Sequence, residues 1–266
     1  MMIALWKVML IQLNNMTENF FKNRNIIVAG ASSGVGRETA IALSKLGANV
    51  ILVSRNEKKL DAVLLTDLVK GEHSKFVFDF EKTENISDLL NQIMSLYDSI
   101  DGLVYSAGTS KRVRFKNLTT DVLDSVMRVN FYSFVELIRG IVSKKRKDNE
   151  LRIVGVSSLA SSENAKFFLP YAASKNALES SVRILSNELK GQNVFISGIK
   201  PAYIDTPFIA SNNDIYGDFN KYLTEGYQPY GLIPTHVISE AICFLLGPNA
   251  KYYSGSCVKI PAGVCC

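Results

Sequence analysis

Residues 25–36 of the chain read N-I-I-V-A-G-A-S-S-G-V-G, and this stretch decides the fold. Its first five residues are mostly apolar and rich in β-branched side chains, which is typical of a buried strand. Three glycines follow, Gly30, Gly34 and Gly36, and residues 37–46 then carry apolar side chains at helical spacing. The stretch therefore predicts a strand, a glycine turn and a helix in direct succession.

The same alternation of apolar runs and helical patterns continues along the chain. We expect further strands at 49–53, 75–80, 102–105, 152–157, 194–199 and 256–260, and further helices at 57–69, 86–96, 123–142, 171–189 and 236–246. Near-continuous apolar strands separated by helices are typical of a parallel sheet that helices cover on both faces. The sequence thus predicts an α/β fold, a doubly wound parallel sheet (Rossmann fold) of about seven strands in a single domain.

The composition narrows the class of protein. The chain has 266 residues, of which 47% are hydrophobic and 21% charged, and its formal net charge of +5 comes from scattered basic residues. This is an ordinary globular composition that does not call for a nucleic-acid partner. The four cysteines lack metal-ligand spacing, so we expect no metal site and a reduced, cytoplasmic protein. No polybasic segment precedes the terminal pair Cys265 and Cys266, so lipidation is not expected there.

Residues 1–22 precede the first strand and are expected to be an extension. It is either flexible or an incorrectly assigned start, because Met16 offers a second initiator. The apolar run at 1–13 is short and interrupted by Lys7, so it predicts neither a signal peptide nor a membrane span. Residues 23–266 then form the single domain, with a loop-rich lid at about 203–235. Aromatic residues of this lid could shape a pocket, although several could simply pack: Phe208, Tyr216, Phe219, Tyr222, Tyr227 and Tyr230.

The glycine turn has the features of a phosphate-binding site. Glycine lets the backbone approach a ligand closely, and the amides at a helix N-terminus attract anions. Because a strand precedes the turn and a helix follows it, the turn predicts binding of a dinucleotide pyrophosphate. The residues expected to hold it are Gly30, Ser32, Ser33, Gly34, Val35 and Gly36.

The end of the second strand indicates which dinucleotide binds. A carboxylate there would accept hydrogen bonds from the ribose of NAD and repel the extra phosphate of NADP. The chain instead has Ser54 and Arg55, and a guanidinium suits a phosphate dianion. We therefore expect NADP(H) as the preferred cofactor, with NAD(H) as the alternative. Arg37 could add positive potential nearby.

Three polar residues form the candidate catalytic group. Tyr171 and Lys175 are four apart on an expected helix and so share one face. Ser158 ends the fifth strand, and its spacing favours it over Ser157. Hydride transfer to a carbonyl builds negative charge on oxygen, which Ser158 could bind and Tyr171 could protonate. A free phenol has a pKa of about 10, so Tyr171 needs a nearby cation, for which Lys175 is suited.

The spacing G-x-x-x-G-x-G at Gly30–Gly36, together with Ser158 and the Y-x-x-x-K at Tyr171 and Lys175, resembles the short-chain dehydrogenase/reductase family, particularly its 3-oxoacyl-[acyl-carrier-protein] reductase-like members. Matches in family order run from about residue 25 to residue 263. Three departures are Ala29 for a usual threonine, Ser106 for an asparagine that braces the sheet, and Ala202 for a glycine.

The resemblance implies further site residues. Lys175 would also hold the nicotinamide ribose, and Asn130 would anchor a water chain to this lysine. Other positions would lie along the cofactor: Asp79 and Phe80 at the adenine, Ser106, Ala107 and Gly108 against the backbone of the site, and Pro201, Ile204 and Thr206 at the nicotinamide.

The function expected from these residues is NADPH-dependent hydride transfer between the cofactor and a small carbonyl or alcohol substrate, as in a ketone or 3-oxoacyl thioester reductase. Two alternatives stay open: an NAD-dependent alcohol, steroid or sugar dehydrogenase, and a non-catalytic NADPH-binding sensor or scaffold. The resemblance also implies a homodimer or homotetramer that pairs through the helices expected at 123–142 and 171–189. We expect no membrane partner.

Overall fold

Seven parallel strands form one sheet in the computed structural model, which describes residues 20–69, 71–162, 166–210 and 227–264. The spatial order is β3-β2-β1-β4-β5-β6-β7, and each neighbouring pair is parallel. The strands are β1 Asn25–Ala29, β2 Asn49–Ser54, β3 Ser74–Val77, β4 Gly102–Tyr105, β5 Leu151–Val156, β6 Val194–Pro201 and β7 Cys257–Ile260. The predicted doubly wound sheet is confirmed.

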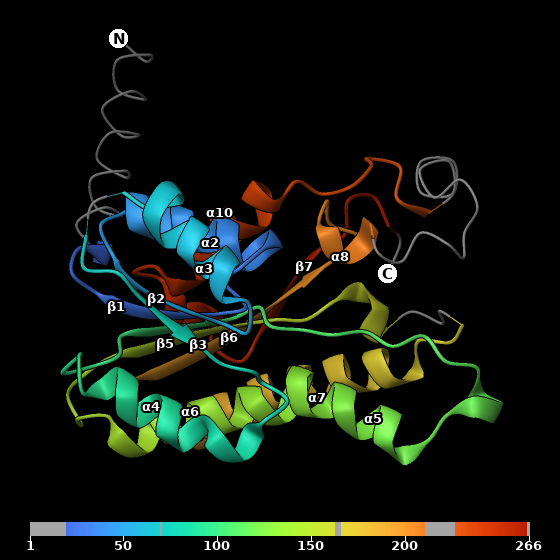
Figure 1. Cartoon of the computed structure of the whole chain (residues 1–266), viewed down its shortest axis with the longest axis horizontal. Coiled ribbons are helices and arrows are strands. Elements are labelled where there is room, and N and C mark those ends of the chain that lie inside the picture. Colours follow the sequence, from blue (N-terminus) through green and yellow to red (C-terminus); the bar gives the residue numbers. More distant parts are fainter. Residues whose placement is uncertain (1–19, 70, 163–165, 211–226, 265–266) are drawn as a thin grey trace, which may run out of the picture.

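Helices cover both faces of this sheet (Figure 1). One face carries α2 Gly34–Lys45, α3 Glu57–Ala62 and α10 Thr235–Leu246, and the other carries α4 Ile86–Met94, α5 Thr120–Met127, α6 Ser133–Lys144 and α7 Leu169–Glu188. Two shorter helices are α8 Pro207–Ala210 and α11 Ala250–Tyr253. None of the helices in the described part of the chain combines the length and the apolar character needed to cross a membrane.

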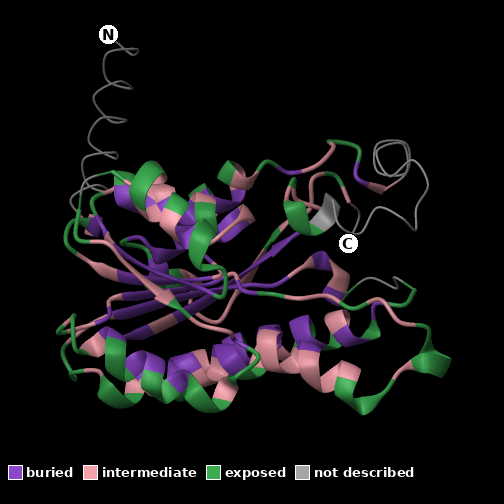
Figure 2. Ribbon diagram, viewed as in Figure 1, coloured by how far each residue is buried: buried purple, intermediate pink, exposed green. Residues whose placement is uncertain are grey.

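The core consists of two apolar layers, one on each face of the sheet. Along β1, Ile26 and Val28 point into the layer beneath α2 and α10, while Ile27 and Ala29 point into the layer beneath α4, α6 and α7. Both sets are buried because a central parallel strand has helices on both sides. Figure 2 shows that buried residues fill the strands and the inward sides of the helices.

Three elements differ from their predicted form. The helix expected at 123–142 is α5 and α6 joined by a π-helical segment, Arg128–Tyr132. The helix expected at 57–69 is α3 followed by a π-helical segment, Val63–Asp67. The strand expected at 75–80 ends at Val77, because the Asp79 carboxylate accepts a hydrogen bond from the Glu81 amide (3.1 Å) and turns the chain.

Because all the strands are parallel, their carboxyl ends lie along the same side of the sheet. The glycine turn follows β1, and Ser54 and Arg55 stand at the end of β2. Ser106 follows β4, and Ser158 comes two residues after the last residue of β5. In open α/β sheets ligands bind beyond the carboxyl ends of the strands, so this side is where a site is expected.

Candidate active site

A cleft of about 450 Å³ runs along this side of the sheet. Every site residue expected from the sequence lines it except Asn130. The lining residues from that set are Gly30, Ser32, Ser33, Gly34, Val35, Gly36, Ser54, Arg55, Asp79, Phe80, Ser106, Ala107, Gly108, Ser158, Tyr171, Lys175, Pro201, Ile204 and Thr206. The chain therefore brings residues from six strand ends to one cavity.

The glycine turn packs too tightly for side chains. Gly30 has a φ of +85°, and a Cβ on it would lie 2.6 Å from the Ala107 amide nitrogen. A Cβ on Gly36 would overlap the Gly30 carbonyl oxygen and Ser106 Oγ. The helix α2 starts at Gly34 with no acidic residue in its first turn and no side-chain cap from Ser33. Its first amides are thus available to a phosphate, so the turn fits the pyrophosphate of a dinucleotide.

Ser106 braces the sheet in place of the asparagine that the family usually has. Its hydroxyl donates to the Ala29 carbonyl (2.8 Å), and its backbone amide donates to the same oxygen (3.0 Å). These bonds tie the end of β4 to the end of β1 directly beneath the glycine turn. The smaller side chain therefore still connects the two central strands.

The end of β2 presents hydroxyl and guanidinium groups to the cleft. Ser54 Oγ donates to Ser32 Oγ (2.8 Å), and the exposed Arg55 lines the same end. The first acid after them, Glu57, pairs with Lys75 at 3.0 Å. Arg37 lies outside the lining and pairs with Asp67 at 2.8 Å, which lowers the pKa of that carboxyl. Among the lining residues, Arg55 is thus the cation closest in sequence to the glycine turn.

Asp79 and Phe80 line the cleft just after β3, where the family resemblance predicts the adenine. The Asp79 carboxylate also caps its own turn through the Glu81 amide. Phe80 is 5% exposed and packs edge-on against Tyr105, with ring centroids 5.6 Å apart. Both residues therefore have structural contacts in addition to their place in the cleft wall.

Tyr171 and Lys175 project from one face of α7 into the cleft. The Tyr171 ring contacts two aromatic rings, with its centroid 6.2 Å from that of Phe168 and 6.1 Å from that of Phe208. Lys175 Nζ is 5.7 Å from the Tyr171 ring centroid and donates to the Val156 carbonyl (2.7 Å). Burial lowers the pKa of Lys175 to about 8, although the Glu179 carboxylate acts in the opposite direction.

The two serines after β5 have different surroundings. Ser158 is half-buried, lines the cleft and accepts a hydrogen bond from the Ala160 amide (3.2 Å), capping the short 3₁₀ turn Leu159–Ser161. Ser157 also borders the cleft, but it is 3% exposed and donates to the Glu179 carboxylate (2.6 Å). The Ser157 hydroxyl is thus bound to the protein interior, which favours Ser158 as the group facing a substrate.

Behind these serines lies a buried polar cluster that the sequence analysis did not identify. Glu179 accepts from Ser157 and from Ser161 (2.5 Å) on one oxygen and pairs with Lys200 (3.1 Å) through the other. Glu179 stands four residues after Lys175 and eight after Tyr171, so the helical repeat of α7 could have indicated it. No comparable signal connects it with Lys200, because β6 meets α7 only in the folded chain.

Asn130 lies outside the cleft, in the π-helical segment between α5 and α6, and is fully buried. Its carboxamide accepts from the Thr109 amide (2.8 Å) and donates to the Thr109 carbonyl (2.9 Å) and to Ser174 Oγ (2.9 Å). These bonds connect the segment after β4 with α7. The role of Asn130 in a water chain stays a prediction, whereas its hydrogen bonds to Thr109 and Ser174 are direct.

The segment at about 203–235, which the sequence predicts to be a lid, is described in part. Phe208 packs on Tyr171, Tyr227 packs edge-on against Tyr203 (5.6 Å), and Tyr230 is 82% exposed. Gln228 is buried and clamps the Tyr203 backbone, accepting from its amide (2.8 Å) and donating to its carbonyl (2.9 Å). No sequence motif indicates this glutamine. Residues 1–19, the lid residues Tyr216, Phe219 and Tyr222, and the Cys265 and Cys266 pair lie outside the described residues.

Within the described ranges, no three His, Cys, Asp or Glu side chains are grouped so that they could hold a metal ion. Cys243 and Cys257 are free thiols. Burial raises the pKa of Cys257 to about 11, so this thiol has little tendency to ionise at neutral pH.

Known proteins share both the sequence pattern and the fold. The family model for short chain dehydrogenase matches residues 24–216. L-xylulose reductase of Caenorhabditis elegans is 29% identical over 91% of this chain and 96% of its own length. The 3-oxoacyl-[acyl-carrier-protein] reductase of Buchnera aphidicola is 25% identical, with coverages of 89% and 95%.

Solved structures of similar fold include a 3-oxoacyl (acyl-carrier-protein) reductase from Agrobacterium tumefaciens C58 with NADP bound. Its TM-score is 0.84 at 22% identity, over 94% of this chain and 97% of that one. L-sorbose reductase from Gluconobacter frateurii, complexed with NADPH and L-sorbose, gives 0.84 at 22% identity, over 92% and 97%. The chain therefore belongs to the short-chain dehydrogenase/reductase family, oxidoreductases that act on CH–OH and C=O groups with a nicotinamide cofactor.

Proposed function

We propose that this chain is an NADPH-dependent reductase of ketones, with 3-oxoacyl thioesters among the candidate substrates. The observation that carries the proposal is the shared position of Tyr171, Lys175 and Ser158. Tyr171 and Lys175 project from one face of α7, and Ser158 follows strand β5. All three line one cleft together with the glycine turn. A sensor or scaffold would not need this complete group.

The proposed chemistry divides the reaction between cofactor and protein. When bound, the reduced cofactor supplies the hydride that adds to the carbonyl carbon. The Ser158 hydroxyl donates a hydrogen bond to the carbonyl oxygen and holds it in place while negative charge develops there. The Tyr171 hydroxyl then delivers the proton that completes the alcohol.

Lys175 is proposed to assist Tyr171 by its charge. A cation beside a phenol stabilises the phenolate that remains after proton transfer. With a pKa of about 8, Lys175 is mostly protonated at neutral pH although it is buried. Its hydrogen bond to the Val156 carbonyl fixes the ammonium group near the Tyr171 ring. The same side chain would hold the ribose next to the nicotinamide.

NADPH is proposed over NADH because of the residues at the end of β2. Arg55 and Ser54 offer a guanidinium and a hydroxyl to a ribose phosphate, and the nearby acid Glu57 is paired with Lys75. Two structural neighbours also support this choice, since one has NADP bound and the other is complexed with NADPH. The curated relatives are named as reductases of a keto-sugar and of a 3-oxoacyl carrier substrate, so the substrate is sought among these classes.

The proposal is tested by an NADPH-oxidation screen of the purified chain. The substrates are 3-oxoacyl thioesters, diketones, keto-sugars and ketosteroids, each at several concentrations, and the loss of NADPH absorbance gives the rate. We expect turnover of at least one class, with a higher kcat/KM with NADPH than with NADH. Tight NADPH binding without turnover of any compound would contradict the proposal and favour a sensor.

A further inference from the structure

The cleft is not evenly charged along its length. Among the described residues, the acids that line it are Asp79 and Glu81, which follow β3, the strand at one end of the strand order. The segment after β4 contributes Lys111 and Arg112, and among the described residues no acid lines the cleft from β4 to β6. The described lining residues on the side of the cleft that holds Tyr171 therefore include cations and aromatic rings but no acid.

Arg112 lies one aromatic ring away from the proposed proton donor. Its Cζ atom sits 4.4 Å from the centroid of the Phe168 ring, which in turn packs edge-on against Tyr171. Phe168 is 8% exposed, so it gives the guanidinium a firm base. A guanidinium stacked on a ring is held in a plane, and its planar set of N–H donors has the geometry that suits a carboxylate or a phosphate.

The backbone on either side of Arg112 is fastened to the rest of the site. Asn130 holds both backbone groups of Thr109, and the Val113 amide donates to the Phe167 carbonyl (3.0 Å). Lys111 Nζ donates to Ser125 Oγ on α5 (2.8 Å). Because the segment 109–113 is fixed at three points, little ordering is needed when a ligand meets its cations.

We propose that the carbonyl substrate carries an anionic group, a carboxylate or a phosphate, which binds Arg112, with Lys111 at the mouth of the cleft. This inference rests on the proposed function, which supplies the carbonyl. It follows from charge as well as position, because the attraction of an anion to a partly buried guanidinium is screened less than at an exposed site. The anion also holds the substrate at a fixed distance from Tyr171.

Matched pairs of ketones test the inference. The carboxylate arm uses 4-oxopentanoate, 6-oxoheptanoate and 8-oxononanoate against their methyl esters, so that the spacer length varies. The phosphate arm uses dihydroxyacetone phosphate against dihydroxyacetone. In at least one pair we expect the anion to have a kcat/KM about tenfold higher than its neutral partner, which corresponds to about 1.4 kcal/mol.

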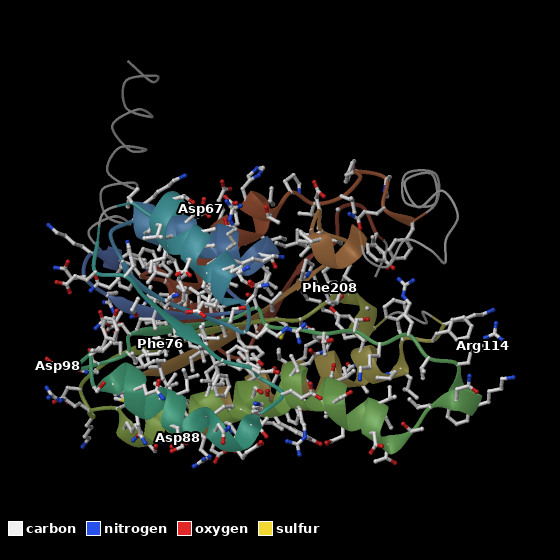
Figure 3. The ribbon with its side chains drawn as sticks, in the orientation of Figure 1. Asp67, Phe76, Asp88, Asp98, Arg114 and Phe208 are labelled. Atoms are coloured by element: carbon white, nitrogen blue, oxygen red, sulfur yellow. The ribbon has the colours of Figure 1, made fainter. Side chains whose placement is uncertain are left out.

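Variants of the segment after β4 assign that preference to a residue. Arg112→Gln should bring the ratio of kcat/KM for anion over neutral partner close to one, mainly through KM, while Arg112→Lys should keep part of it. Arg114→Gln is the matched control. Arg114 is exposed, does not line the cleft and lies at the outer edge of the molecule, farther out than Phe208 (Figure 3). This control should keep the wild-type ratio.

The outcomes separate the two proposals. Equal kcat/KM for anion and neutral partner in every pair would overturn the anion site and leave the reductase intact. A preference that survives both Arg112→Gln and the double variant with Lys111→Gln would also overturn it. No turnover of any compound would instead contradict the proposed reductase, and the anion site with it.

Discussion

Lys200 Nζ lies 3.1 Å from Glu179 Oε2, and both side chains are buried between α7 and β6. The other carboxylate oxygen of Glu179 accepts hydrogen bonds from Ser157, just before Ser158, and from Ser161, three residues after it. Lys200 directly precedes Pro201, which lines the cleft. The Glu179–Lys200 ion pair thus connects the segment around Ser158, which is proposed to face the substrate, with the segment that begins at Pro201, which is proposed to face the nicotinamide.

We expect Lys200→Met to lower the free energy of unfolding by about 3–5 kcal/mol, because it leaves a buried carboxylate without its counter-ion. Adding Glu179→Gln should recover most of this loss, since glutamine keeps an acceptor for the two serines and has no charge. Urea denaturation of Lys200→Met, Glu179→Gln and the double variant measures the effect. Arg139→Gln, at an exposed helix pair, serves as the control. Additive losses in the double variant would show that the two groups do not act as a pair.

The buried Lys175 predicts a dependence of stability on pH. Its pKa is about 8 in the folded protein and higher when unfolded, so the unfolded chain binds more protons between these values. Stability contributed by this residue is therefore lowest below pH 8 and rises towards pH 10. In cofactor-free protein, we expect the free energy of unfolding of the wild type to increase relative to that of Lys175→Met between pH 8 and pH 10. The exposed Lys190→Met is the comparison variant, and a constant difference for Lys175→Met would refute the shift.

Tyr171→Phe should lower kcat at least about a thousandfold, because it removes the proposed proton donor. NADPH affinity, measured by fluorescence titration, should stay within about twofold, since the change is below 1 kcal/mol. The matched control is Tyr252→Phe, at a tyrosine that is 75% exposed. Turnover retained by Tyr171→Phe would mean that the proton comes from another group.

The choice of cofactor can be tested at Arg55. We expect Arg55→Asp to weaken NADPH binding by at least about tenfold, because a carboxylate repels the ribose phosphate that the guanidinium would bind, while NADH binding holds or improves. Arg37→Gln is the control, because Arg37 pairs with Asp67 and does not line the cleft. Isothermal titration with both cofactors gives the ratio. Equal losses for the two cofactors in Arg55→Asp would contradict the prediction.

Local patterns were enough to predict the frame of this site. The glycine turn needs only a strand before it and a helix after it, and Tyr171 and Lys175 meet through the repeat of one helix. Ser158 follows from its position at the end of β5. The parallel sheet and its helices on both faces follow from the same alternation of apolar strands and helices, whereas the order of the strands was not predicted.

The residues that were missed depend on contacts between distant segments. Glu179 meets Lys200 across α7 and β6, and Gln228 meets Tyr203 across the lid. Arg112 gains its place through Phe168, more than fifty residues later in the chain. Each of these side chains looks ordinary in the sequence, because no spacing rule connects the two partners before the chain folds.

The π-helical segment at Arg128–Tyr132 ties the catalytic cleft to the core in a way that affects insertions and deletions. A π turn contains one residue more than an α turn, so losing a single residue here would restore a regular helix. It would also rotate everything on one side of the deletion by about 100° relative to the other. Either Asn130 would leave Thr109 and Ser174, or Phe134 and Leu137 would leave the apolar layer. The length of this stretch is therefore under two separate constraints, and substitutions other than at Asn130 should be tolerated there far better than a change in residue number.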